Sequence, residues 1–139
     1  MDPGLVLLEH LPHLRFVSLY NTAVTDHGLR HLAKLTRLTG LGLGWTGVGD
    51  VGLSHLQHLT ELETLGLVQT QVSDAGLVYL KHMTRLRVLN LEGSKVTDEG
   101  LVHLEKLTNL KEVNVQRTKV TDKGADRLQA ALPNCTISH

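Results

Sequence analysis

Residues 83–106 read MTRLRVLNLEGSKVTDEGLVHLEK, and this stretch carries the pattern that organises the whole 139-residue chain. Leu89 and Leu91 alternate with polar neighbours as residues of a short strand do. Leu101 and Leu104 are three apart, as on one face of a short helix. The stretch therefore predicts one strand followed by one short helix.

The same pattern repeats along the chain with a period of 24 residues. Rows of that length align as L-x-x-L-x-x-L-x-L-x-x-T-x-V-T-D-x-G-L-x-x-L-x-x, with occasional replacements. One strand and one helix cannot bury their own apolar sides, so such units stack with their strands in parallel. We predict a single domain over residues 1–139: a half-repeat (1–10), five full repeats (11–34, 35–58, 59–82, 83–106 and 107–130) and a terminal stub (131–139).

This unit resembles the leucine-rich repeat, in the T-D-x-G-L-x-x-L variety found in many bacterial repeat proteins. It is also similar to the cysteine-containing repeats of F-box adaptors, although Thr or Ser stands here where those repeats usually carry Cys or Asn. The resemblance covers almost the whole chain. It implies an α/β solenoid, a right-handed horseshoe with parallel strands on its concave face and short helices on its convex face. Because one fold serves many functions, it does not name a partner.

Several columns recur in nearly every repeat and are predicted to serve the scaffold. A hydroxyl residue after each strand can bond the backbone at the turn. We interpret the Thr or Ser that precedes each helix as its N-cap, and the Asp that follows as a favourable charge in the first turn of the helix. The alternative is that this column of Asp residues binds a cation. A Gly inside each helix costs about 1 kcal/mol relative to Ala, so we expect neighbouring repeats to approach closely there. The columns are Thr22, Thr46, Thr70, Ser94, Thr118; Thr25, Ser73, Thr97, Thr121; Asp26, Asp50, Asp74, Asp98, Asp122; and Gly28, Gly52, Gly76, Gly100, Gly124.

The residues that differ between repeats are the candidates for binding. Phe16, Tyr20 and Trp45 align with strand positions that face away from the core, and four glycines beside them are expected to expose a shallow floor. Large aromatic side chains around such a floor are typical of a binding hot spot. The alternative is that Phe16 and Tyr20 only cover the first strand and that Trp45 packs on them. The four glycines are Gly40, Gly42, Gly44 and Gly66. The predicted partner-binding residues are Phe16, Tyr20, Trp45, Gly42, Gly44, Thr64, Val68, Asn90, Glu92 and Asn114, of which the last three belong to a polar rim.

Catalysis and metal binding are not expected. His55 and His58, two of nine histidines, are three apart, but no carboxylate or cysteine completes a ligand set with convincing spacing. We interpret the histidines as solvent-facing polar residues and expect no metal and no cofactor. The sequence contains no nucleophile motif and no phosphate-binding glycine loop, so we do not expect an enzyme. Cys135, the only cysteine, aligns with the start of a sixth strand and is interpreted as structural.

Composition limits the classes of partner. Lys plus Arg and Asp plus Glu number 14 each, so there is no net positive charge to attract nucleic acid. The sequence starts without signal-peptide features, and its apolar run at residues 5–8 is too short to cross a bilayer. A single cysteine favours a reducing, cytoplasmic setting. We therefore expect a non-catalytic module that binds another protein, with no nucleic-acid or membrane partner.

The ends of the array support a second hypothesis. Asp2, Gly4, Leu5 and Leu8 align with the helical half of a repeat, so the sequence begins with a helix and no strand. Uncapped ends of a solenoid pair with further repeats or with other molecules. The alternative function is a structural or self-assembling segment of a larger repeat protein with no ligand of its own, joined through the edge strand near Phe16.

Overall fold

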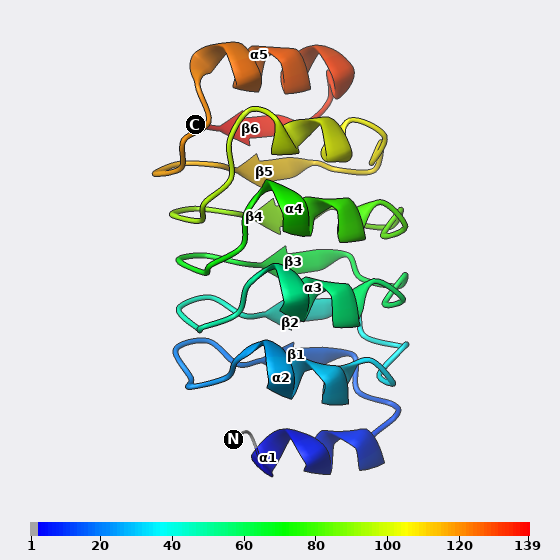
Figure 1. Ribbon diagram of the computed structural model, residues 1–139. Helices are drawn as coiled ribbons and strands as arrows, with labels where there is room; N and C mark the ends of the chain where they lie inside the picture. Colours follow the sequence, from blue (N-terminus) through cyan, green and yellow to red (C-terminus); the bar gives the residue numbers. More distant parts are fainter. Residues whose placement is uncertain (1–2) are drawn as a thin grey trace.

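The computed structural model describes residues 3–139 as a solenoid, with one parallel sheet on one side and short helices on the other (Figure 1). Asp2, one of the residues aligned with the repeat pattern, lies outside the described part. The strands are β1 (Phe16–Ser18), β2 (Gly40–Gly42), β3 (Thr64–Gly66), β4 (Val88–Asn90), β5 (Glu112–Asn114) and β6 (Thr136–Ser138). The α-helices are α1 (Pro3–Val6), α2 (Asp26–Leu29), α3 (Asp50–Leu56), α4 (Asp74–Leu77) and α5 (Asp122–Ala131). The 3-10 helices are η1 (Leu7–His10), η2 (Arg30–Leu32), η3 (Val78–Leu80) and η4 (Gly100–Leu104). The predicted α/β solenoid is confirmed.

The strands lie side by side in chain order, from β1 to β6. Val17 pairs with Leu41 and Leu41 with Leu65, so each step across the sheet equals 24 residues (41 − 17 = 24). The sheet is open, with β1 and β6 as its two edges. The pairing register therefore follows the period that the sequence predicts.

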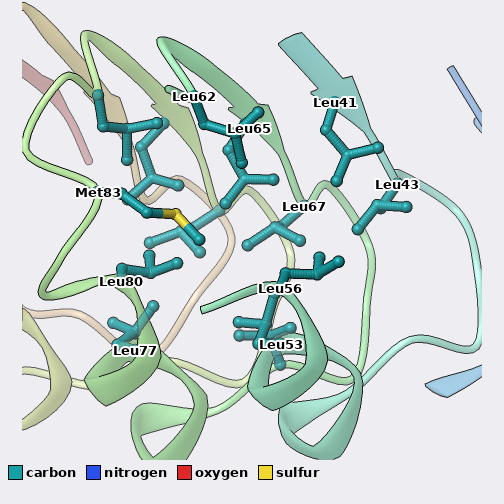
Figure 2. Packing of buried hydrophobic residues seen from close by; sticks show 14 of the residues in the cluster. Leu41, Leu43, Leu53, Leu56, Leu62, Leu65, Leu67, Leu77, Leu80 and Met83 are labelled. Atoms are coloured by element: carbon teal, nitrogen blue, oxygen red, sulfur yellow. The ribbon is translucent and has the colours of Figure 1, made fainter. Parts of the chain in front are cut away.

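Leucine side chains fill the space between the sheet and the helices. Figure 2 shows Leu65 of β3 and Leu53 of α3 on opposite sides of this space, with Leu67 and Leu56 between them, and all four are fully buried. Met83 replaces leucine at the start of its row and is fully buried as well. Burying one such side chain stabilises the fold by about 1.5–3 kcal/mol. Because the positions that repeat in every row supply the core, the opposite face of the sheet is left to the residues that vary.

The hydroxyl column has the structural role that the sequence predicts. Thr46 Oγ1 donates to the carbonyl of Leu43 at 2.6 Å, and Thr70 Oγ1 donates to Leu67 at 2.8 Å. Thr22 and Thr118 make the same bond to the residue three positions earlier. Ser94 departs from the pattern, because its hydroxyl is buried and has no hydrogen-bond partner among the described residues.

Replacing Ser94 with threonine is expected to stabilise the protein by about 0.5–1.5 kcal/mol, the value of one net hydrogen bond. Branching at Cβ restricts the side chain to fewer rotamers, and threonine fits the equivalent buried sites at Thr46 and Thr70. Urea denaturation of both proteins measures the difference. Ser94→Ala serves as the comparison and should cost little, because the hydroxyl it removes is unbonded; a lower stability for Ser94→Thr would refute this account.

The Asp column joins each repeat to the next. The Asp74 carboxylate accepts hydrogen bonds from the Thr97 backbone N–H at 2.7 Å and from the Thr97 hydroxyl at 2.6 Å. We call this pair of bonds an Asp staple. The same staple joins Asp50 to Ser73 and Asp98 to Thr121, while Asp26 accepts from the N–H of Gly49 at 2.6 Å.

The staple corrects the capping prediction. Ser73 stands at the N-cap of α4, but its hydroxyl donates to Asp50 and does not cap its own helix. After Thr97 the next helix is η4, which begins only at Gly100. The Thr121 hydroxyl does cap its helix, accepting from the N–H of Gly124 at 3.3 Å, and the Thr97 hydroxyl accepts from the N–H of Glu99, just ahead of η4, at the same distance. Donation to the carboxylate of the preceding repeat does not exclude capping, because a hydroxyl can donate one hydrogen bond and accept another, as that of Thr121 does.

The staple also affects ionisation and explains the glycine column. The Thr121 hydroxyl, followed by its backbone N–H, holds the pKa of Asp98 below its usual value. A Cβ on Gly52 would lie 2.5 Å from Asp26 Oδ1, and one on Gly124 would overlap the Asp98 carboxylate. The predicted close approach between repeats is confirmed, and the group that approaches is the carboxylate of the staple.

The first helical segment is fastened to the second by an ion-pair cluster. Glu9 Oε1 lies 2.5 Å from His31 Nδ1, and Glu9 Oε2 lies 3.1 Å from Lys34 Nζ. The His31 hydrogen bond, followed by that of Lys34, lowers the pKa of Glu9. His31 is half-buried, as are His55 and His103 in the same column, so the interpretation of the histidines as solvent-facing is wrong at these three positions. Over residues 3–139, none of the helices is long and apolar enough to span a membrane.

Candidate functional site

The open face of the sheet, which points away from the helices, presents the first and third residues of each strand. The middle residue is buried, as Val17 is in β1 and Leu65 in β3. Parallel pairing therefore arranges the outward residues in two rows. The first row is Phe16, Gly40, Thr64, Val88, Glu112, Thr136, and the second is Ser18, Gly42, Gly66, Asn90, Asn114, Ser138.

The aromatic side chains at one end of this face are exposed but do not surround an empty floor. Phe16 and Tyr20 keep 63% and 57% of their surface exposed. A Cβ on Gly40 would lie 2.5 Å from Phe16 Cδ2, and one on Gly44 would lie 3.0 Å from Tyr20 Cδ2. Gly40 and Gly44 are buried, so the prediction that they form an exposed floor is wrong. Each ring covers a residue of the neighbouring repeat that has no side chain.

A bare strip remains over Gly42 and Gly66. Both glycines are half-buried, and the nearest neighbour of a Cβ on Gly42 would be Ser18 Oγ at 3.4 Å. Next to the strip, the predicted site residues Thr64 and Val68 are exposed and half-buried, respectively. The floor is thus narrower than expected and lies between the two aromatic rings and β4.

Trp45 lies in the turn after β2, which corrects its predicted place on a strand. Its φ angle is +57°, and the equivalent residues of neighbouring repeats, Asn21 and Gln69, have φ angles of +54° and +53°. Its N–H donates to the Val68 carbonyl at 2.7 Å, which fixes the turn. The indole side chain is 52% exposed. A left-handed backbone costs a bulky residue about 1–2 kcal/mol, whereas glycine adopts it freely.

The polar rim residues do lie together at the other end of the face. Glu92 Oε2 accepts from Asn114 Nδ2 at 3.4 Å, and Glu92 Oε1 lies 3.6 Å from Arg117 Nε. Asn90 Oδ1 accepts from the N–H of Glu92 at 3.0 Å, and Asn114 Oδ1 accepts from the N–H of Gln116 at 2.9 Å. These bonds hold both amide side chains in fixed orientations.

A hollow of about 250 Å³ lies over β4, β5 and β6. Glu112 and Val88 line it and are absent from the predicted site, as are Thr136 and Ser138 of β6. Cys135 aligns with the start of a sixth strand and residues 136–138 with the strand columns, so this alignment is the signal that could have found Thr136 and Ser138. The full lining is Val88, Leu89, Asn90, Glu112, Val113, Asn114, Thr136 and Ser138.

Comparison with solved structures shows the same fold. An internalin of Listeria monocytogenes matches with a TM-score of 0.79 at 24% identity, covering 96% of this chain and 36% of its own. A leucine-rich-repeat protein of Leptospira interrogans matches with a TM-score of 0.79 at 21% identity, covering 96% of this chain and 33% of its own. The Leucine Rich repeat family model matches residues 82–104 and 106–128.

This chain is a leucine-rich-repeat protein. It spans about a third of the length of the internalin and of the Leptospira protein. At this level of identity the likeness establishes the fold, and the T-D-x-G-L-x-x-L variety stays a prediction. No curated protein matches the sequence.

The leucine-rich-repeat array has a second apolar feature at its N-terminal end. A hollow of about 310 Å³ lies between the first helical segment and β1. Within residues 3–15 there is no strand to cover it. Its lining is Gly4, Leu5, Leu8, Leu19, Ala23 and Val24.

The single cysteine of the leucine-rich-repeat chain belongs to the scaffold. Cys135 is buried, and burial, followed by the nearby Glu112 carboxylate, raises the pKa of its thiol. A raised thiol pKa disfavours the nucleophilic thiolate, in agreement with the structural interpretation of Cys135. In the part of the chain that the structure describes, no three His, Cys, Asp or Glu residues gather in a way that would hold a metal ion.

Proposed function

We propose that this leucine-rich-repeat protein is a non-catalytic module that binds a protein partner on the open face of its sheet. Leucine-rich repeats commonly mediate protein–protein interactions, which supports the class of function. The observation that carries the choice of surface is Trp45, whose large side chain is 52% exposed on a left-handed turn.

The left-handed turn at position 45 does not require a tryptophan. The turn needs only a residue that tolerates a positive φ, and Gly93 occupies the equivalent position two repeats further on, with φ +67°. A tryptophan there costs folding free energy and leaves apolar surface in water. Tryptophan is also among the residues that most often dominate binding free energy at protein interfaces. Phe16 and Tyr20 carry less weight, because they also cover Gly40 and Gly44.

Trp45→Gly is expected to abolish partner binding without loss of stability. Glycine relieves the backbone strain, so thermal denaturation should show a melting temperature equal to or above that of the wild type. Affinity capture from a lysate of the source organism, read by mass spectrometry, should recover a partner with the wild type and not with Trp45→Gly. Loss of a hot-spot side chain costs about 2 kcal/mol or more, roughly a 30-fold drop in affinity.

The matched control is Val51→Ala, which removes an apolar side chain that is 62% exposed on α3, on the helical side. This variant should recover the same partner as the wild type. Equal recovery by the wild type and Trp45→Gly would contradict the proposed surface.

Self-association is the second candidate function, and the N-terminal hollow favours it. An apolar hollow of about 310 Å³ beside the free edge of β1 is the kind of surface that pairs with another strand. Ala23→Glu would introduce a charge into this hollow, whereas Ala75→Glu, on an exposed position of α4, provides the control.

Light scattering over a range of protein concentrations separates the two functions. If the ends associate, the mass of the wild type and of Ala75→Glu rises with concentration, and the mass of Ala23→Glu stays at that of a monomer. A constant monomeric mass for all three proteins would exclude self-association.

A further inference from the structure

The hollow over β4, β5 and β6 differs in chemistry from the aromatic end of the open face. Its lining combines one carboxylate, two carboxamides, two hydroxyls and an apolar part, and contains no Lys or Arg. Its volume of about 250 Å³ is below the roughly 300–1,000 Å³ of pockets that hold whole small molecules. A space of this size suits a single side chain of a partner.

Glu112 supplies the unbalanced charge of the hollow. It is exposed, and none of the ion pairs found among residues 3–139 includes it. The neighbouring carboxylate, Glu92, is already engaged by Arg117 and by the Asn114 amide. Lys111 precedes Glu112 in the chain but does not line the hollow. The hollow therefore attracts a cation.

The other lining groups match a planar cation better than a compact one. Thr136 and Ser138, on the strand beside Glu112, bring hydroxyl oxygens that can accept hydrogen bonds. Val88, on the opposite side of Glu112 in the same row, offers an apolar surface. A guanidinium binds a carboxylate through two parallel N–H donors and is more weakly hydrated than an ammonium, so it tolerates apolar contact.

We propose that this hollow binds the guanidinium of an arginine side chain in an extended segment of the protein partner. The inference rests on the proposed function and assigns the partner's chemistry. Glu112 of β5 is in register with Gly40 of β2, three strand spacings or about 14 Å away across the sheet, and Trp45 lies five residues beyond Gly40. The two binding points are therefore at least about 14 Å apart, which an extended chain covers in about four residues. The partner segment thus carries its arginine at least about four residues from the residue that contacts Trp45.

The test uses the folded chain, labelled with nitrogen-15, and Nα-acetyl-arginine-N-methylamide as the probe. Titration followed by NMR should give saturable shifts in the Glu112 backbone signal and in the Asn90 and Asn114 side-chain amide signals, with millimolar affinity. Nα-acetyl-citrulline-N-methylamide has the same shape without the charge, and it should give no saturable shift. Glu112→Gln should weaken binding of the arginine probe at least fivefold.

Glu99→Gln is the matched control, because Glu99 is an exposed carboxylate just before η4, away from the sheet. It changes the net charge equally and should bind the arginine probe as the wild type does. Equal shifts with the citrulline probe, unchanged binding by Glu112→Gln, or no saturable shift at the hollow would overturn the proposal. Trp45→Gly should still bind the arginine probe. A negative result with the probe would therefore overturn the arginine site without affecting the affinity-capture test of Trp45.

Discussion

Gly76→Leu is expected to destroy cooperative folding of the repeat array. Gly76 lies in α4, where a Cβ would overlap Asp50 Oδ1 and lie 3.2 Å from Leu53 Cδ1. Asp50 cannot move aside without breaking its bonds to the N–H and hydroxyl of Ser73, at 2.7 and 2.6 Å. Overpacking of this kind costs about 1–3 kcal/mol for extra methylenes, and the loss of a charged hydrogen-bond pair adds to it. Circular dichroism during urea denaturation should show no native baseline or a midpoint far below that of the wild type.

Two variants separate the clash from the general effect of replacing glycine in a helix. A Cβ on Gly4, in α1, would meet nothing within 4 Å, so Gly4→Ala should be neutral or stabilising by up to about 1 kcal/mol. Gly76→Ala should destabilise, and adding Asp50→Ala should cost less than the sum of the single changes, because the clash disappears with the carboxylate. Native stability in Gly76→Leu would rule out the carboxylate as the reason for this glycine.

Asp74→Ala is expected to lower the free energy of unfolding by about 2–4 kcal/mol. The substitution removes both bonds of one Asp staple, at 2.7 and 2.6 Å, and leaves the N–H and hydroxyl of Thr97 without their acceptor. Because a solenoid is stabilised mainly by contacts between neighbouring repeats, the loss falls on a single joint. Denaturation by urea, followed by circular dichroism, should show a lower midpoint and a broader transition, as the two sides of the joint begin to unfold separately.

Asp122 provides the control, since it belongs to the same column but its side chain is 93% exposed. Its carboxylate lies 3.1 Å from His139 Nδ1, a surface ion pair worth about 0–1 kcal/mol. Asp122→Ala should therefore leave the transition almost unchanged. If Asp74→Ala and Asp122→Ala destabilise the protein equally, the staple is not the source of the stability.

The sequence predicts the path of the backbone well because every repeat contains the same local pattern of leucines. The positions of Leu89 and Leu91 select a strand and those of Leu101 and Leu104 select a helix, and stacking leaves one way to bury them all. A single period therefore fixes the sheet order and the pairing register, which the structure confirms from β1 to β6.

Contacts between repeats are harder to predict, since they depend on side-chain directions. From sequence alone, the Thr or Ser before each Asp is expected to cap its own helix. Only the stacking of the repeats shows that the Ser73 hydroxyl reaches Asp50 of the preceding repeat. The position of the Phe16 ring over Gly40 is a rotamer choice that no period encodes. The left-handed turn at Trp45 escapes prediction because strand alternation, continued past the end of β2, assigns this residue to the strand as well.

The Asp staple has a consequence for how such an array changes in length. The repeats that contain Asp74 and Asp98 each carry one carboxylate that bonds the following repeat and one Ser or Thr that bonds the preceding repeat. Duplication or deletion of a whole unit within this region would therefore recreate the same joint and leave no acceptor or N–H orphaned. Each such event would move the Glu112 hollow relative to Trp45 by one strand spacing, about 4.8 Å. A gene encoding this architecture can thus change the length of the proposed binding face without any change in the core of the other repeats.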